Sequence, residues 1–196
     1  MSEEAFILHG APTLAGIKTG SLFRCTYENA EAMRASLREW NLRFSGKGLR
    51  VVPLSFENNK ALLYLYRPSK LDRDLKDSAA SRILSDCGYC TGTSERCLSC
   101  LAKRIRTCED FPHEIGLFLG YPPEDVRGFI EHRECDLKCV GCWKVYGDEA
   151  KAEKTFRLFR KCSRIYRQQW ENGTPIERLT VAEHRTGRIR RETPCG

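Results

Sequence analysis

The spacing of apolar residues along the chain predicts a mixture of strands and helices. Residues 5–10 (AFILHG) form a short apolar run that glycine and proline close, which predicts a buried strand. Residues 21–27 (SLFRCTY) predict a second strand. Two further strand-like runs, residues 49–56 and 60–67, are separated only by the turn residues ENN. These two runs therefore predict a β-hairpin.

A helical period is clearest in residues 28–44. There Met33, Leu37, Trp40 and Phe44 follow one another at spacings of four, three and four residues. Side chains at these spacings lie on one face of an α-helix, so they predict an amphipathic helix packed on a core.

Proline, glycine and acidic residues mark the limits of the other predicted elements, because proline and acidic residues favour helix starts and glycine favours helix ends. Helices are expected over residues 68–84, 95–108, 112–120, 122–131 and 149–170, and a strand over 138–146. The pattern as a whole predicts an α+β (mixed α/β) fold.

One domain accounts for these elements. Residues 1–170 are expected to form a small sheet that includes the hairpin and is packed by five or six helices, with a cysteine-rich loop at residues 87–100 inserted. Residues 171–196 are expected to be a loose, basic tail. The strand order does not follow from the pattern.

The positive charge is concentrated at the end of the chain. Residues 1–149 contain 21 basic and 21 acidic residues, whereas residues 150–196 contain 12 basic and 5 acidic ones and so hold the whole net charge of +7. A basic segment can bind the phosphates of nucleic acid. It can equally be a solvated helix and tail, which is favoured here because the tail lacks the aromatic residues of a base-stacking surface.

The composition favours a cytoplasmic protein. Apolar residues make up 41% of the chain, no apolar run approaches the length of a membrane span, and the start MSEEAFILHG is unlike a signal peptide. Eleven cysteines is a high and odd number. In a reducing cytosol such a number indicates metal or redox chemistry more often than disulfides.

Four cysteines form the strongest metal-binding pattern. Cys87, Cys90, Cys97 and Cys100 form two C-x2-C pairs separated by six residues. Four thiolates complete the tetrahedral shell of a zinc ion and can also hold an iron–sulfur cluster. Cys108 could replace one of the four. The alternative is a set of reduced thiols or a disulfide switch.

A second cysteine pattern, Cys135-x3-Cys139-x2-Cys142, has the spacing found in radical S-adenosylmethionine enzymes. Only 54 residues follow Cys142, too few for the partial barrel of those enzymes, which needs roughly 150 residues or more after the motif. Cys139 and Cys142 could still bind a metal or cycle as a dithiol. They could also be two small buried side chains.

Three residues are candidates for catalysis. His113 and Glu114 are predicted in the first turn of a helix, where a histidine tends to be neutral and can act as a base. Lys18 lies in the segment GAPTLAGIKTGS, which resembles a phosphate-binding loop but has the wrong spacing before its lysine. The alternative for His113 and Glu114 is capping and packing.

Three segments together resemble a known family. LHGAPTLAGIKTGSLF, FPHEIGLFLGYPPEDVRGFI and CVGCWKVYGD occur in this order over residues 5–168 and are similar to the signature segments of the bacterial domain-of-unknown-function family 3793. The resemblance implies a small cytoplasmic protein, mostly from anaerobic bacteria, without an established activity. The residues that it makes better candidates for a shared site are Pro12, Lys18, His113, Glu114, Gly120, Asp125, Trp143, Lys144 and Tyr146. The Cys87–Cys100 pairs lie outside these segments.

Three functions are compatible with these features. The favoured one is a cysteine-rich accessory protein that binds zinc or an iron–sulfur cluster or carries out thiol redox chemistry. The second is a small enzyme with a pocket around Lys18, His113 and Glu114. The third is a module that binds nucleic acid or an acidic partner through the basic C-terminal segment. The oligomeric state does not follow from the sequence.

Overall fold

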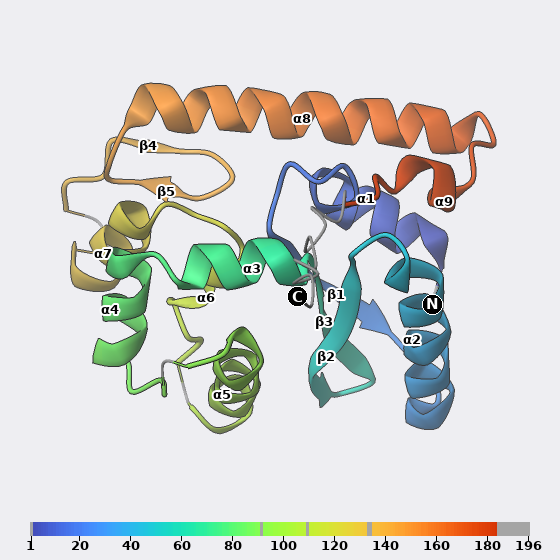
Figure 1. The fold of residues 1–196 in the computed structure, drawn as a ribbon, viewed down its shortest axis with the longest axis horizontal. Coiled ribbons are helices and arrows are strands. Elements are labelled where there is room, and N and C mark those ends of the chain that lie inside the picture. The colour runs from blue at the N-terminus through green and yellow to red at the C-terminus, as the bar shows by residue number, and fades with distance from the viewer. Residues whose placement is uncertain (1, 91, 109, 133–134, 184–196) are drawn as a thin grey trace, which may run out of the picture.

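A three-stranded antiparallel sheet lies at the centre of one part of the molecule (Figure 1). The strands β1 (Gly20–Thr26), β2 (Arg50–Glu57) and β3 (Lys60–Tyr66) are arranged in the order β1-β3-β2. The structure is a computed structural model. It describes the whole chain of 196 residues except residues 1, 91, 109, 133–134 and 184–196.

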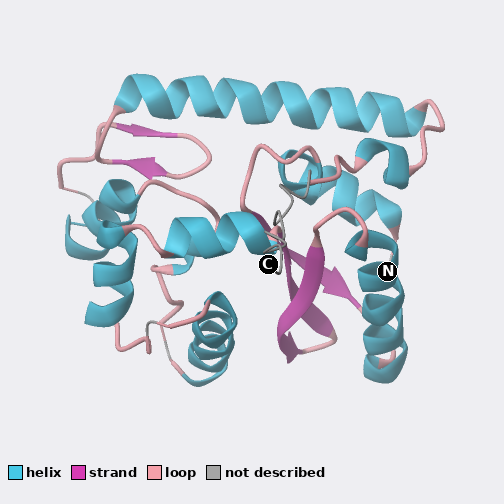
Figure 2. Ribbon diagram, viewed as in Figure 1, coloured by secondary structure: helices cyan, strands magenta, loops and turns pink. Residues whose placement is uncertain are grey.

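Helices make up most of the rest of the described chain (Figure 2). Two short strands form a second, two-stranded sheet. The described residues form nine helices, and the helices and the second sheet are α1 (Glu3–Leu14), α2 (Ala30–Ser45), α3 (Pro68–Leu75), α4 (Ser78–Asp86), α5 (Ser94–Thr107), α6 (Ile115–Phe118), α7 (Pro123–His132), β4 (Cys139–Val140), β5 (Lys144–Val145), α8 (Glu149–Glu171) and α9 (Ile176–Leu179). The predicted α+β fold class in one domain is confirmed, with more helices than the expected five or six.

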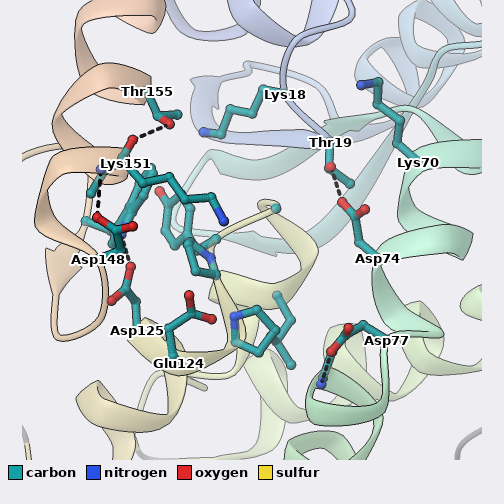
Figure 3. A pocket seen from close by; sticks show the side chains of 18 of the residues that line it. Lys18, Thr19, Lys70, Asp74, Asp77, Glu124, Asp125, Asp148, Lys151 and Thr155 are labelled. Atoms are coloured by element: carbon teal, nitrogen blue, oxygen red, sulfur yellow. Dashed lines mark hydrogen bonds between the residues drawn. The ribbon is translucent and has the colours of Figure 1, made fainter.

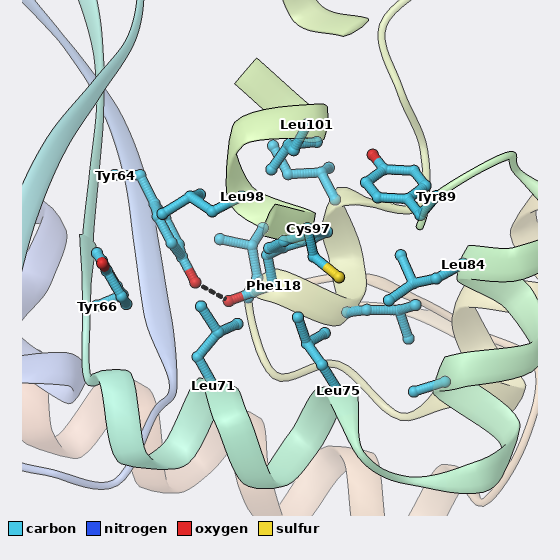
Figure 4. Packing of buried hydrophobic residues seen from close by; sticks show 14 of the residues in the cluster. Tyr64, Tyr66, Leu71, Leu75, Leu84, Tyr89, Cys97, Leu98, Leu101 and Phe118 are labelled. Carbon is cyan, nitrogen blue, oxygen red and sulfur yellow. Dashed lines mark hydrogen bonds between the residues drawn. The ribbon is translucent and has the colours of Figure 1, made fainter. Parts of the chain in front are cut away.

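The alternation of side chains along β3 divides the core in two. Leu63 and Leu65 face a cluster formed with α1 and α2, whereas Leu62 and Tyr64 face a second cluster with α3, α4 and α5. Figure 4 shows this second cluster, in which the Tyr64 hydroxyl donates a hydrogen bond to the carbonyl of Phe118. Because both faces of β3 are covered, the strand is buried along almost its entire length.

The structure confirms the elements that the hydrophobic pattern predicts most clearly. The hairpin is confirmed as β2 and β3, and its two turn residues Asn58 and Asn59 have positive φ angles of 48° and 58°, as a tight hairpin turn requires. The helix expected at 28–44 is α2, whose N-cap Asn29 accepts hydrogen bonds from two backbone amides. The long helix expected at 149–170 is α8.

The strand predicted at residues 5–10 is wrong, because these residues lie inside the helix α1. This helix packs between the central sheet and α8, so apolar side chains are needed on more than one face and the helical period is lost. Gly10 lies against the sheet, where a Cβ atom would come within 2.7 Å of Leu65. A helix that is covered on two sides therefore resembles a buried strand in sequence.

Four other element predictions differ from the structure. The helix expected at 112–120 is confined to α6, so His113 and Glu114 precede it. The single helix expected at residues 68–84 is divided into α3 and α4, because Asp77 accepts hydrogen bonds from the amides of Ala79 and Ala80 and starts a new helix. The strand expected at 138–146 is the short hairpin β4–β5. The second half of the expected loop 87–100 belongs to α5.

The segment predicted to be a loose tail begins with a packed element. Ile176 of α9 is fully buried, and Leu179 is also buried. Both contribute to the cluster shared with α1 and α2. The remaining tail, residues 184–196, lies outside the described residues.

One fully buried cation joins three parts of the chain. Arg67, at the end of β3, donates hydrogen bonds to the carbonyls of Thr13 (2.7 Å) and Leu14 (2.7 Å), which end α1. It also donates to the carbonyls of Val181 (2.8 Å) and Lys47 (3.3 Å). Arg67 therefore fixes the end of α1 against the sheet and the C-terminal segment.

We expect Arg67→Met to lower the free energy of unfolding by about 3–5 kcal/mol, because it removes the guanidinium hydrogen bonds to four backbone carbonyls and the cation that pairs with Glu183 at 3.6 Å. Urea denaturation measures this change. Arg82→Met on the exposed surface of α4 is the matched control and should change stability by less than about 0.5 kcal/mol. Equal effects of the two substitutions would contradict the structural role of Arg67.

Candidate functional site

A cavity of about 380 Å³ lies where the loop after α1, the helices α3 and α4, the start of α7, the β4–β5 hairpin and α8 meet (Figure 3). The residues that line it come from segments far apart in the sequence. Its charged lining residues are Lys18, Lys70, Arg73, Asp74, Asp77, Glu124, Asp125, Asp148 and Lys151. The fold, rather than any local motif, creates this site.

The loop after α1 presents Lys18 to the cavity in a fixed conformation. Gly16, just after α1, has a positive φ of 74°, a left-handed conformation that glycine adopts readily and that prevents the helix from continuing. The amides of Ile17 and Lys18 then both donate to the carbonyl of Pro12 at 3.0 Å. Here a helix precedes the loop and a strand follows it. A phosphate-binding loop has the opposite order, so the resemblance in this segment is local only.

The amine of Lys18 is partly buried and has no ionic partner in the part of the chain that the structure describes. Its Nζ lies 5.4 Å from the ring centre of Tyr121 and 5.8 Å from that of Phe159. Within the described residues it has no hydrogen bond or ion pair through Nζ. Burial lowers the pKa of Lys18 from its ordinary value of 10.5 to about 8, and charge at Cys142 opposes this shift.

Two stacked aromatic rings form one wall of the cavity. Tyr121 and Trp143 stack with their ring centres 4.8 Å apart and their planes at 28°. The Tyr121 hydroxyl donates to the carbonyl of Cys142 at 3.2 Å. Burial raises the pKa of Tyr121 to about 12, so its phenol is neutral at physiological pH. The wall is apolar and rigid.

Asp125 holds this wall in place. Its buried carboxylate accepts hydrogen bonds from the Trp143 indole (2.7 Å) and from the amides of Tyr146 (2.8 Å) and Gly147 (2.7 Å). These bonds attach the β4–β5 hairpin to α7. Because all three donors are protein groups, Asp125 serves as a positioning residue.

Three other acids of the cavity also have protein partners. Asp74 accepts hydrogen bonds from the hydroxyl of Thr19 and from the side chain of Arg73 at 2.8 and 3.0 Å. Asp77 caps α4, and Asp148 caps α8 by accepting from the amide of Lys151 at 3.0 Å. The carboxylates of these three residues therefore already accept hydrogen bonds from the protein.

The side-chain charges left without such partners are mostly positive. Among the described residues, Lys18, Lys70, Lys151 and Glu124 line the cavity without a side-chain hydrogen bond or ion pair. Figure 3 shows the amine of Lys151 and the carboxylate of Glu124 turned toward the space between α8 and α7. The cavity thus contains three cations and one carboxylate that are available to a ligand.

His113 lines a second cavity of about 290 Å³. Its ring meets Phe129 edge to face, with the ring centres 4.7 Å apart, and Lys144 also lines this space. The two cavities share the residues Tyr121, Asp125 and Trp143. His113 and Lys18 therefore line two neighbouring cavities.

Glu114 lies in the core away from both cavities. Its carboxylate is 3% exposed and accepts hydrogen bonds from the Tyr89 hydroxyl (2.9 Å) and the Arg104 guanidinium (2.7 Å). The residues expected to surround one pocket are thus separated, and Glu114 has the packing role given as its alternative. The sequence predicts Glu114 as the carboxylate of the site, whereas Glu124, ten residues further on, lines the cavity of Lys18.

The first cysteine set is spread over two helices and the loop between them. Cys87 ends α4 and Cys90 is exposed, whereas Cys97 and Cys100 are one turn apart in α5. Figure 4 shows Cys97 packed among leucines of the core. Burial raises the pKa of both Cys87 and Cys97, which favours their neutral thiols.

The second cysteine pair belongs to another part of the molecule. Cys139 packs with Val145 and Phe156, and the exposed Cys142 lies in the β4–β5 turn near Lys18. Among the described residues no three His, Cys, Asp or Glu side chains form a group that could hold a metal ion, and the ten described cysteines form no disulfide. No helix in the described ranges has the length and apolar character needed to cross a membrane.

Sequence reasoning identified Lys18 but missed Lys151. One signal could have found it, because Lys151 lies in the first turn of α8, where the helix dipole disfavours a cation. Tyr121 carried no comparable signal, because an aromatic residue between a glycine and two prolines is equally compatible with packing.

The three segments that carry the family resemblance meet at these cavities. Lys18, Gly120, Asp125 and Trp143 line the first, and His113 lines the second. A family model matches residues 6–180, which is most of the chain. No curated protein and no solved structure matches it. The chain therefore belongs to the DUF3793 family, a family of proteins of unknown function.

Proposed function

We propose that the protein binds a small anionic molecule in the cavity lined by Lys18 and Lys151. The observation that carries this proposal is the amine of Lys18, which is partly buried and has no anionic partner among the described residues. Removing a cation from water without pairing it is unfavourable. A bound carboxylate or phosphate would supply the missing partner.

The other features of the cavity support a ligand of this class. A volume of about 380 Å³ suits a small molecule. The stacked rings of Tyr121 and Trp143 offer an apolar surface for the carbon skeleton of the ligand. Glu124 has no hydrogen-bond partner among the described residues, so it can accept a hydrogen bond from a hydroxyl or amino group of the ligand. The ligand therefore combines an anionic group with a small carbon skeleton that carries a hydroxyl or amino group.

Inorganic phosphate and pyruvate are suitable first probes of this site. At a concentration about ten times the dissociation constant, either should stabilise the protein by about 1.4 kcal/mol and raise Tm by roughly 3–5 °C. Lys18→Met and Lys151→Met should each abolish the shift, whereas Lys103→Met on the exposed face of α5 should retain it. Sodium chloride at equal ionic strength is the control for screening, and an identical Tm shift with chloride would count against a specific site.

Lys18→Met should itself stabilise the free protein at pH 7, by about 1–2 kcal/mol, because it removes a desolvated charge that is still partly screened by solvent. The pKa of Lys18 is about 8 in the folded protein against an ordinary value of 10.5. Below pH 8 Lys18 is therefore protonated in both the folded and the unfolded protein, and the full cost of burying its charge lowers the stability of the parent protein. As the pH rises from 8 to 10.5 the folded form loses its proton first, and the stability difference should shrink.

Urea denaturation of both proteins at pH 7, 9 and 10.5 measures this effect. Lys103→Met is again the control and should show no gain at any pH. A Lys18→Met protein that is less stable than the parent at pH 7 would mean that the amine has a stabilising partner, and the basis for an anion site would be lost.

The second candidate function is the metal-binding or thiol-redox role that the cysteine spacing predicts. The observation that favours it is that Cys90 and Cys100 are close enough to Cys97 for their charges to raise its pKa further. A metal shared by these thiols and Cys87 requires Cys97 to turn out of the core. The cofactor would be zinc or an iron–sulfur cluster.

This second proposal predicts stoichiometric zinc or iron in protein purified without oxygen, and loss of that metal in Cys97→Ser. Elemental analysis together with an absorption spectrum distinguishes zinc from an iron–sulfur cluster. Cys25→Ser, in the opposite core cluster, is the matched control and should keep the metal. Metal far below one equivalent in the parent protein would sink this proposal.

A further inference from the structure

We infer that Lys18 is a nucleophile that forms an imine with the carbonyl group of an anionic aldehyde or ketone, such as a 2-oxo acid, bound in this cavity. The inference rests on the proposed anion site and adds the chemical class of its ligand. It assigns different roles to the cations of the cavity. Lys151 binds the anionic group, and Lys18 reacts with the carbonyl carbon.

The surroundings of the Lys18 amine suit this role. Its Nζ faces the rings of Tyr121 and Phe159, and no described carboxylate forms an ion pair with it. Its loop is fixed by the two hydrogen bonds to the carbonyl of Pro12, so the amine enters the cavity from a defined direction. A lysine in such apolar surroundings loses its proton more readily than a solvated one, and only the neutral amine has a lone pair for attack.

The lowered pKa of Lys18 supports the same assignment. With a pKa of about 8, roughly a tenth of the amine is neutral at pH 7, compared with less than a thousandth for a lysine near 10.5. Lys18 therefore presents about two orders of magnitude more reactive amine than a solvated lysine. Lys151 is exposed at the start of α8, which suits it to charge pairing with the ligand.

Glu124 is placed to transfer protons during this reaction. It projects from the first turn of α7 into the same cavity, and its carboxylate has no hydrogen-bond partner among the described residues (Figure 3). The other four acids of the cavity accept hydrogen bonds from the protein. Glu124 is thus the carboxylate in the described lining that is available as general acid and base.

The step balances without any further reactant. The Lys18 nitrogen forms a bond to the carbonyl carbon as the C–O π electrons move to oxygen. One nitrogen proton passes to that oxygen through the Glu124 carboxylate, which gives a carbinolamine. Glu124 takes the second nitrogen proton and gives a proton to the hydroxyl group, which leaves as water while the C=N bond forms. The amine and the carbonyl compound thus yield an imine and one water molecule.

Reductive trapping tests this inference directly. The full chain is incubated with pyruvate or glyoxylate and sodium cyanoborohydride, and the modified residue is located by peptide mass spectrometry. We expect modification of Lys18 to be at least about tenfold faster than that of the exposed Lys103 in the same sample, because Lys18 has more neutral amine and a bound reactant. The rate of trapping at Lys18 should rise with pH and reach half of its maximum near pH 8.

Three variants separate the roles within the cavity. Lys18→Arg should lose the adduct while keeping its fold by circular dichroism. Lys151→Met should slow trapping at Lys18 and also remove the Tm shift caused by pyruvate. Glu124→Gln should slow trapping by about a hundredfold and leave that Tm shift intact, which a purely structural role of Glu124 would not produce.

The outcomes distinguish this inference from the anion site on which it rests. A Tm shift with pyruvate without a preferential adduct on Lys18 would contradict imine formation but would still support anion binding in the cavity. Adducts spread evenly over exposed lysines overturn the imine as well. Absence of both the Tm shift and the adduct overturns both proposals, whereas a rapid adduct on Lys18 that Lys18→Arg abolishes supports them together.

Discussion

The buried guanidinium of Arg67 is the interaction on which the geometry of the site depends. An arginine can be removed from water only if its planar set of donors finds acceptors, and here four backbone carbonyls from three separate segments provide them. Two of these carbonyls end α1. The backbone amide of Arg67 also donates to the carbonyl of Thr19 at 3.0 Å. Arg67 therefore fixes both ends of the loop that carries Lys18, and so it determines where that amine enters the cavity.

Arg67 and Lys18 show two different consequences of burying a cation. Arg67 has protein acceptors for its donors and stabilises the junction of α1, β3 and the C-terminal segment. Lys18 lies a few residues from this junction, in a loop that cannot move freely, and its amine has aromatic rings as neighbours where an acid would stabilise it. The rigid surroundings maintain the unfavourable position of Lys18. Such a position is typical of a group whose reactivity or ligand, rather than the stability of the fold, requires it.

The acids around the cavity show why residue type alone does not identify a site. Five carboxylates of the described residues line it, yet four of them accept hydrogen bonds from the protein. Two of the four cap helix starts, one attaches the β4–β5 hairpin, and Asp74 accepts from Thr19 and Arg73. Glu124 and its neighbour Asp125 both line the cavity, but Glu124 is exposed whereas Asp125 is buried and accepts hydrogen bonds from the hairpin. The aromatic wall in turn depends on Asp125, since its carboxylate orients Trp143 against Tyr121. The chemistry available in the cavity therefore depends on which polar side chains already have hydrogen-bond partners within the protein.

The sequence by itself determined α2 and α8, whose 3.6-residue repeat is set by a single buried face. It also determined the β2–β3 hairpin, for which two apolar runs and the turn asparagines between them were sufficient. It also indicated Lys18 and the family. Tertiary structure decided that residues 5–10 are helical, because α1 is covered on two sides and its exposed face carries the apolar Leu8, so no helical period is visible in the sequence. Tertiary structure also separated Lys18, His113 and Glu114 and brought Lys151 and Glu124 to the cavity of Lys18. Which side chains meet there depends on how α7 and α8 pack, and no spacing along the chain reveals it.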